Sequence, residues 1–252
     1  MFNLNDKVCI ISGGANGIGE AAVKKFAEEG SNVVIADVDK VNAEKVIAEC
    51  KKFGSRDHIF INTDATNKND VVNMVYETVA RYGKIDILVN CTGGFLKERM
   101  TVDIEESEWD QIMSLNVKSA FFCSQAVIPH MIKNSGGRIV NVSSESGRTA
   151  ITLSASHYAA AKSAILGFTR HLAKEVGPYG IYVNCIAPGP TITPRFKIAR
   201  SQEFINDAAE KSPLGRLSTT EEQADAILFL SSDRASYITG ATLDIGGGRL
   251  MM

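Results

Sequence analysis

Short apolar segments alternate with longer amphipathic segments along the whole of this 252-residue chain. The apolar segments have the length of strands, and several, such as residues 85–89, are apolar enough to be buried on both faces of a sheet. We expect strands at residues 7–12, 32–37, 58–63, 85–90, 138–143, 181–186 and 242–245. The amphipathic segments predict helices at residues 17–29, 41–53, 68–82, 105–133, 155–176 and 220–231.

Strands that alternate with helices in this way form βαβ units. We therefore predict an α/β fold, a Rossmann-like, doubly wound sheet of about seven parallel strands with helices on both faces. Neither a linker nor a low-complexity segment divides the chain, so we expect a single domain over residues 1–252. The only tryptophan, Trp109, lies in a predicted amphipathic helix and is expected in the core.

The composition is that of an ordinary globular protein and narrows the choice of partners. A formal net charge of −2 gives no support for nucleic acid or an anionic membrane as a partner. The five cysteines form no CxxC pair, which indicates neither a disulfide framework nor a metal site. No leader-like segment opens the sequence, and no apolar run approaches about 18 residues. We therefore expect a cytoplasmic protein that does not associate with membranes.

A glycine-rich loop follows the first predicted strand and opens the first predicted helix. The N-terminus of a helix carries unpaired N–H groups and a partial positive charge, and glycines let a pyrophosphate approach the backbone. A glycine loop alone also builds ordinary turns, so its place between strand and helix is what indicates a dinucleotide site. The loop residues expected at this site are Ser12, Gly13, Asn16, Gly17, Ile18 and Gly19.

Polar and glycine residues also collect where the other predicted strands end. In an open parallel sheet these carboxyl ends share one edge, where ligands bind. The second strand ends at Asp37, whose carboxylate suits an adenosine ribose and would repel a 2′-phosphate, favouring NAD over NADP. The alternative for Asp37 is a solvated turn residue. Asp64 follows the third strand, where its carboxylate suits an adenine amino group. The later strands end in Asn90, Ser143, Ser144, Pro188 and Gly189.

Tyr158 and Lys162 are four residues apart on a predicted helix and therefore share one face. An isolated tyrosine has a pKa of about 10, too high for easy proton transfer at neutral pH. A neighbouring ammonium favours the phenolate and lowers that pKa, which makes Tyr158 a candidate general acid or base. A surface lysine packed over an aromatic ring is the alternative. His157 precedes the tyrosine, but a neighbour at i−1 on a helix points elsewhere, so we expect no catalytic role for it.

Several motifs occur here in the order and at the spacings of one family. Beside the glycine loop, the chain holds Tyr158-x-x-x-Lys162 and Ser144-x-x-Gly147. Further matches are Asp64-Ala65-Thr66, Asn116, and the segment Pro188-Gly189-x-x-x-Thr193. With these motifs the chain resembles the short-chain dehydrogenase/reductases over essentially its whole length.

The resemblance implies a role for each matching residue. Tyr158 would exchange a proton with the substrate oxygen, and Ser144 would orient and polarise that oxygen. Lys162 would bind the nicotinamide ribose and lower the pKa of Tyr158, while Asn116 would hold a water in the proton relay. Beside the glycine-loop residues, the implied NAD site comprises Asp37, Asp64, Ala65, Asn90, Tyr158, Lys162, Pro188, Gly189, Thr191 and Thr193.

Two motifs depart from the family pattern. Residues 90–93 are N-C-T-G where the family has N-N-A-G, and the bulkier middle pair is expected to narrow the floor of the cofactor site. Ser144 precedes Tyr158 by 14 residues, one more than the commonest spacing. The S-x-x-G pattern nevertheless selects Ser144 over Ser143, with one extra residue in the loop at 148–156.

Residues 188–218 hold four of the six prolines and no clear strand, and we expect them to form a mobile lid. Cations on this lid and beside the serine are either a solvated face or contacts for an anionic substrate. They are Arg148, Arg195, Lys197 and Arg200.

The resemblance implies an NAD(H)-dependent oxidoreductase that interconverts a secondary alcohol and its ketone. The 3-hydroxyacyl thioesters are among the candidate substrates. The alternatives are a non-catalytic partner subunit of a dehydrogenase complex and a nucleotide-sugar epimerase or dehydratase. The resemblance further implies a homo-oligomer, since the usual assembly of the family is a tetramer.

Overall fold

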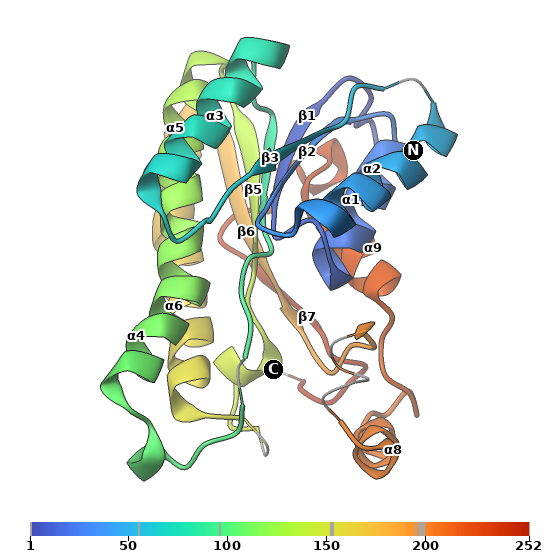
Figure 1. Ribbon diagram of the computed structural model, residues 1–252, viewed down its shortest axis with the longest axis vertical. Helices are drawn as coiled ribbons and strands as arrows, with labels where there is room; N and C mark the ends of the chain where they lie inside the picture. The colour runs from blue at the N-terminus through green and yellow to red at the C-terminus, as the bar shows by residue number, and fades with distance from the viewer. Residues whose placement is uncertain are drawn as a thin grey trace.

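The computed structural model describes residues 2–54, 56–95, 97–151, 154–194, 196 and 200–251. At its centre lies a seven-stranded sheet in the order β3-β2-β1-β4-β5-β6-β7 (Figure 1). Every neighbouring pair is parallel. This confirms the predicted α/β class. The strands are β1 (Val8–Ser12), β2 (Asn32–Asp37), β3 (Ile59–Asn62), β4 (Ile87–Asn90), β5 (Gly137–Val142), β6 (Ile181–Pro188) and β7 (Thr242–Ile245).

Helices cover both faces of the sheet, as predicted (Figure 1). One face carries α1 (Gly17–Glu28), α2 (Lys40–Cys50) and α9 (Thr220–Leu230). The other carries α3 (Lys68–Tyr82), α5 (Ser119–Lys133) and α6 (Ser156–Val176). Two shorter helices, α4 (Glu106–Met113) and α8 (Gln202–Glu210), lie toward the lower end of the view.

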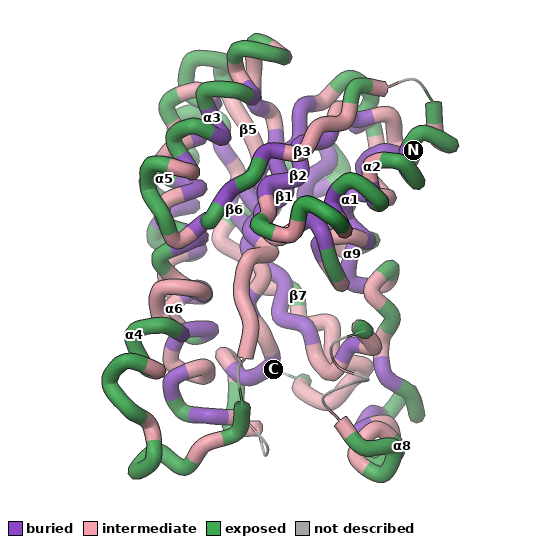
Figure 2. The backbone as a smooth tube through the Cα atoms, viewed as in Figure 1, coloured by how far each residue is buried: buried purple, intermediate pink, exposed green. Residues whose placement is uncertain are grey.

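The central strands β1 and β4 are buried (Figure 2). Their side chains alternate between two apolar layers, one on each face of the sheet. In β1, Cys9 and Ile11 pack in the layer that contains Phe26 of α1. Ile10, between them, packs in the opposite layer with Met74 of α3. Strands of this sheet are therefore apolar at successive residues and do not alternate between apolar and polar residues.

The order of the strands creates a crevice at the centre of the sheet. From β1 the chain builds outward through β2 and β3, and it then returns to the other side of β1 with β4. Connections leave the two halves in opposite directions, so the carboxyl ends of β1 and β4 are left uncovered between them. Open α/β sheets bind their ligands at this switch point.

The helix predicted at residues 105–133 is interrupted. Its middle, Ser114–Lys118, forms a π-helical turn between α4 and α5. In this turn the side-chain amide of Asn116 donates to the carbonyl oxygen of Ile112 at 3.0 Å, a contact that competes with the regular backbone bond. The expectation that Trp109 is in the core was wrong, since its exposed fraction is 39%. The buried residue of short α4 is Ile112, which leaves Trp109 at the surface.

The sequence interpretation missed α8, which lies inside the segment expected to be a lid. It is nine residues long, and its apolar residues Phe204, Ile205 and Ala208 do recur at helical spacing, but they lie in the proline-containing segment that was interpreted as a lid. Its first turn is fixed by Ser201, whose hydroxyl oxygen accepts the backbone N–H of Phe204 at 3.2 Å.

None of the helices in the described ranges is long and apolar enough to cross a membrane. Among those same residues, His, Cys, Asp and Glu side chains form no group of three that is arranged to hold a metal ion.

Candidate active site

A cleft of about 730 Å³ lies at the carboxyl ends of the strands. Its walls come from the loops after β1 to β6, the first turn of α1, the first two turns of α6 and the π-helical turn. The structure brings together here most of the residues that the sequence suggested. These are Gly13, Asn16, Gly17, Ile18, Gly19, Asp37, Asp64, Ala65, Ser144, Tyr158, Lys162, Pro188, Gly189, Thr191 and Thr193.

The glycine loop needs glycine for reasons of space and backbone conformation. Gly13 and Gly17 have φ angles of +73° and +58°, in the left-handed region. A Cβ on Gly19 would lie 2.0 Å from the carbonyl oxygen of Gly13. The side chain of Asn16, at the N-cap of α1, makes no capping bond and donates instead to Asp39. The loop thus brings its backbone and the start of α1 to the cleft, an arrangement that suits a phosphate.

The end of β2 presents two carboxylates. Asp37 Oδ2 accepts the backbone N–H of Ala15 at 3.0 Å, and Asp37 Oδ1 accepts that of Asp39 at 3.0 Å. These bonds orient the Asp37 carboxylate over the glycine loop. The pKa of Asp39 is lowered, first by a hydrogen bond from the backbone N–H of Asn42 and then by the Asn16 amide. The end of β2 therefore carries two carboxylates beside the glycine loop.

Asp64 is fixed within its own turn at the end of β3. One oxygen, Oδ1, accepts from both the backbone N–H and the hydroxyl of Thr66, at 2.8 and 2.7 Å. The backbone N–H of Asp64 donates to Asp70 at 3.1 Å. Ala65, next in the chain, is buried but also lines the cleft. The turn therefore holds the Asp64 carboxylate in one orientation at the cleft, where a ligand could contact it.

Lys162 is buried under the cleft and lies beside Tyr158. Its Nζ donates to the carbonyl oxygen of Val142 at 3.0 Å and lies 5.7 Å from the centroid of the Tyr158 ring. Burial lowers the pKa of Lys162 to about 8, because the apolar surroundings disfavour the charged form. Below that pH the Lys162 side chain is a buried ammonium beside the Tyr158 ring.

The two serines after β5 make different contacts. Ser143 is buried, and its hydroxyl donates to the carbonyl oxygen of Lys162 at 2.7 Å. Ser144 lies in the cleft wall, and its Oγ accepts the backbone N–H of Ser146 at 3.1 Å. The second contact uses a lone pair and leaves the hydroxyl proton of Ser144 out of that bond. Ser143 thus holds α6 in place, whereas Ser144 has the geometry to donate to a substrate oxygen.

Three expected site residues lie behind the cleft wall instead of lining it. Ser12 Oγ pairs with Thr92 Oγ1 at 2.7 Å. Asn90 donates to the side chain of Asn141 at 2.8 Å. Asn116 accepts the backbone N–H of Gly94 at 2.9 Å and donates to the carbonyl oxygen of the same residue at 3.0 Å. The side chains of Ser12 and Asn116 thus fasten the turn after β4 that forms the floor of the cleft, whereas Asn90 joins β4 to β5.

Several cleft residues were not singled out from the sequence as site residues. Leu115 comes from the π-helical turn, and nothing in the local sequence indicates that it reaches the cleft. Outside the cleft lining itself, Phe95 packs against Tyr158, with 5.4 Å between the two ring centroids. The others lie at or after strand ends, and that position was the available signal; they are Val38, Thr63, Val142 and Pro194. The cleft is also lined by residues 91–94 and by Ser143, which the sequence had already placed at strand ends.

The cations proposed for an anionic substrate have internal partners where the structure describes them. Arg148 pairs with Asp244, with 2.8 Å between the guanidinium nitrogen and the carboxylate oxygen. Arg200 pairs with Glu98, and its guanidinium lies 4.8 Å from the ring centroid of Phe204. Arg195 and Lys197 lie outside the described residues.

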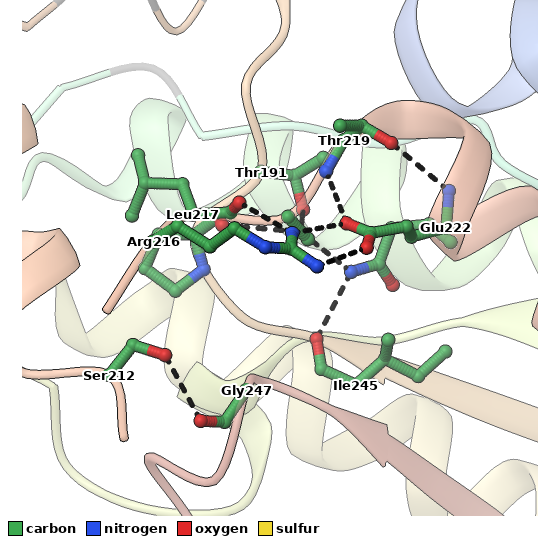
Figure 3. Close-up of polar contacts among 11 residues, drawn as sticks. Thr191, Ser212, Arg216, Leu217, Thr219, Glu222, Ile245 and Gly247 are labelled. Atoms are coloured by element: carbon green, nitrogen blue, oxygen red, sulfur yellow. Dashed lines mark hydrogen bonds and ion pairs between the residues drawn. The ribbon is translucent and has the colours of Figure 1, made fainter. Parts of the chain in front are cut away.

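The two ends of the segment between β6 and α9 are fastened to each other and to β7 (Figure 3). Thr191 Oγ1 pairs with Ser218 Oγ at 2.8 Å. Buried Gln223 donates to Ser218 and to the carbonyl oxygen of Ile245. Next to this network, Arg216 and Glu222 form a two-bond ion pair at the start of α9. Thr191 is thereby held in the cleft wall.

Comparison with known proteins places the chain in a family. A family model described as enoyl-(acyl carrier protein) reductase matches residues 13–249. The 3-oxoacyl-(acyl-carrier-protein) reductase of Thermotoga maritima is 38% identical over 98% of this chain and 99% of its own length. An NAD-dependent glycerol dehydrogenase of Listeria innocua is 39% identical over 98% of this chain and 95% of its own.

Solved structures agree with these sequence relatives. A 3-oxoacyl-(acyl-carrier protein) reductase from Brucella melitensis with bound NAD superposes with a TM-score of 0.91 and 33% sequence identity. The superposition covers 98% of this chain and 92% of that one. The chain belongs to the short-chain dehydrogenase/reductases. It is an oxidoreductase that uses a nicotinamide cofactor.

Proposed function

We propose that this protein is an NAD(H)-linked oxidoreductase that interconverts a secondary alcohol and its ketone. The observation that carries the proposal is the composition of one cleft. Asp37 enters it from the end of β2, whereas Tyr158 and Lys162 enter it from α6, which packs on β6. Ser144 lies in the same wall as the tyrosine. A dinucleotide that spans the cleft would place its adenosine near the carboxylate and its nicotinamide near the phenol.

A bound nicotinamide would supply or accept the hydride, and the protein would handle the proton. In the direction of reduction, the Tyr158 hydroxyl donates a proton to the carbonyl oxygen of the substrate, and the Ser144 hydroxyl donates a hydrogen bond to that oxygen. The Lys162 ammonium stabilises the phenolate that remains. In oxidation the same phenolate accepts the hydroxyl proton of the alcohol.

We propose NAD(H) over NADP(H) because of the carboxylates at the end of β2. Asp37 is held over the glycine loop by the backbone N–H groups of Ala15 and Asp39, and its charge opposes a 2′-phosphate. Two similar proteins support this choice, the NAD-dependent glycerol dehydrogenase and the reductase that holds NAD in its structure. The thioester class of substrate is supported by the name of the Thermotoga maritima relative.

A cofactor assay of Asp37→Ser tests this proposal. The wild-type enzyme should reduce a 3-oxoacyl thioester with NADH at least about tenfold more efficiently than with NADPH, a difference of ~1.4 kcal/mol. Asp37→Ser should shift the ratio of the two kcat/KM values toward NADPH by about the same factor, since the repulsion is gone. Asp103→Asn, a change at an exposed carboxylate distant in sequence, is the control. Equal use of both cofactors by the wild type would refute the assignment.

We also propose that the chain assembles with copies of itself, as a tetramer by analogy with the family. An exposed aromatic group on α5 and α6 supports this. Phe121 is 42% exposed, and its ring centroid lies 5.7 Å from that of Phe122 and 6.3 Å from that of Phe168. Large apolar side chains that cluster at a surface are typical of an interface.

A further inference from the structure

A fully buried imidazole directly precedes the reactive tyrosine, and both of its nitrogens are engaged. His157 Nδ1 accepts the backbone N–H of Tyr158 at 2.8 Å. His157 Nε2 lies 3.2 Å from Oε1 of Glu108 in α4. Because Nδ1 is an acceptor, the proton of the neutral ring is on Nε2, where it is donated to the carboxylate. The side chain thus points away from the reacting atoms, as the sequence suggested, but it is bonded to the peptide of Tyr158.

The contact to Tyr158 replaces a missing helix cap. The N–H groups of the first turn of a helix have no partner within the helix, and a side chain at the N-cap normally accepts one of them. The N-cap of α6 is Ala155, which has no acceptor. His157 accepts the N–H at the third helical position from inside the turn, and that position is Tyr158 itself.

The other end of this chain of contacts reaches the segment after β4, through Glu108 of α4 and Arg99. The pKa of Glu108 is lowered, first by the hydrogen bond from His157 and also by Arg99, so the carboxylate stays ionised. Arg99 Nε lies 3.3 Å from Glu108 Oε2. Beside this pair, Thr101 Oγ1 and Ser156 Oγ are 3.1 Å apart. The segment after β4, which includes Phe95 against the Tyr158 ring, is therefore tied to the start of α6 at several points.

We propose that His157 is a positioning residue for the reaction of Tyr158. His157 is held by Glu108, which in turn pairs with Arg99. His157 thereby fixes the first turn of α6 and with it the position of the Tyr158 hydroxyl relative to a bound substrate. This inference rests on the proposed function, since it assigns a purpose to the tyrosine. His157 is absent from the cleft lining, so its effect is on the reaction step and not on cofactor binding. Misplacement of a reacting group by about 1 Å can cost on the order of a hundredfold in rate.

Two substitutions at the same position separate the two contacts of the ring. In His157→Asn the side-chain oxygen takes the place of Nδ1 and still accepts the Tyr158 N–H, but the side chain is too short to reach Glu108. In His157→Gln the amide reaches Glu108 but no longer accepts the neighbouring N–H. We expect kcat to fall about thirtyfold in His157→Gln and only about threefold in His157→Asn. The dissociation constant for NADH should change less than about twofold in both.

A double-mutant cycle tests the link to α4. Glu108→Ala alone should lower kcat about threefold, and adding it to His157→Asn should cause no further loss, because the contact is already broken. His171→Asn, at an exposed position on the same helix, is the matched control and should leave kcat unchanged. Thermal midpoints measured in parallel show that each variant is folded.

The outcomes are distinct. If the wild type reduces no carbonyl compound with either cofactor, the proposed function fails and this inference fails with it. If the wild type is active and both His157 variants keep its kcat, or if the losses in the cycle add, His157 is a structural residue only and the inference is overturned. The inference is also overturned if the His157 variants have lower thermal midpoints but an unchanged kcat per folded molecule.

Discussion

At the scale of single residues, the site depends on groups whose charge is set by burial. Lys162 is the clearest case, because its ammonium is buried and donates to the backbone carbonyl of Val142 at 3.0 Å. A buried ammonium that is kept for its charge lowers the stability of the fold. The Lys162 ammonium offsets this loss of stability with a functional role, since its positive charge would stabilise the Tyr158 phenolate.

The stability of the ligand-free protein should reveal this cost. The folded pKa of Lys162 is about 8, below its ordinary value of 10.5, so between these pH values the unfolded chain binds a proton that the folded chain does not. Stability therefore rises with pH across this window. We expect this rise to be roughly 3 kcal/mol larger in the wild type than in Lys162→Met, as measured by urea unfolding. Parallel pH curves for the two proteins would show that Lys162 is not perturbed.

At the scale of elements, the loop between β1 and α1 depends on close approach of two backbone segments. A Cβ on Gly19 would contact the carbonyl of Gly13, so Gly19→Ala must displace the turn. We expect a loss of about 1–3 kcal/mol in the free energy of unfolding together with weakened NADH binding.

The matched control is Gly177→Ala, because Gly177 has open space around its Cβ position. This substitution should change the unfolding free energy by less than about 1 kcal/mol and leave NADH binding intact. Normal NADH affinity in Gly19→Ala would contradict the assigned place of the cofactor phosphates.

Most elements could be predicted from the sequence because their signals are local. β2, α3 and β7 have the predicted bounds, since their apolar patterns end at turn or capping residues. The π-helical turn at Asn116 and the short α8 were missed. The first depends on one side chain bonding to a carbonyl of the preceding turn. The second is a short helix among the prolines of the segment interpreted as a lid.

Site residues could be predicted from the sequence where they follow a strand end. They were harder to predict where a contact between distant segments determines whether a side chain faces the cleft. Tyr158 and Lys162 share a helix face and both line the cleft. The second role of Ser12 was not visible, because its bond to Thr92 joins two loops that are distant in the sequence. The same bond accommodates the threonine that departs from the family pattern at this turn.

At the scale of the whole molecule, the parallel sheet is covered on both faces by helices. On one of these layers, Phe121 of α5 is 42% exposed and its ring lies near that of Phe168 of α6. If this group forms an interface, a charge placed in it should separate the subunits. We expect Phe121→Glu to reduce the mass in solution from that of a tetramer to that of a smaller species, measured by light scattering. A wild-type protein that is monomeric at micromolar concentration would contradict the proposed assembly.

Proton transfer by Tyr158 is tested most directly in the variant Tyr158→Phe. Two quantities are measured for this variant, its kcat and its dissociation constant for NADH. The phenylalanine keeps the ring against Phe95 and removes only the hydroxyl. We predict a loss of kcat of at least about a thousandfold, within the range of general acid–base catalysis, with the NADH dissociation constant changed less than about threefold. Retention of more than about a tenth of wild-type turnover in a variant that binds NADH normally would contradict the mechanism.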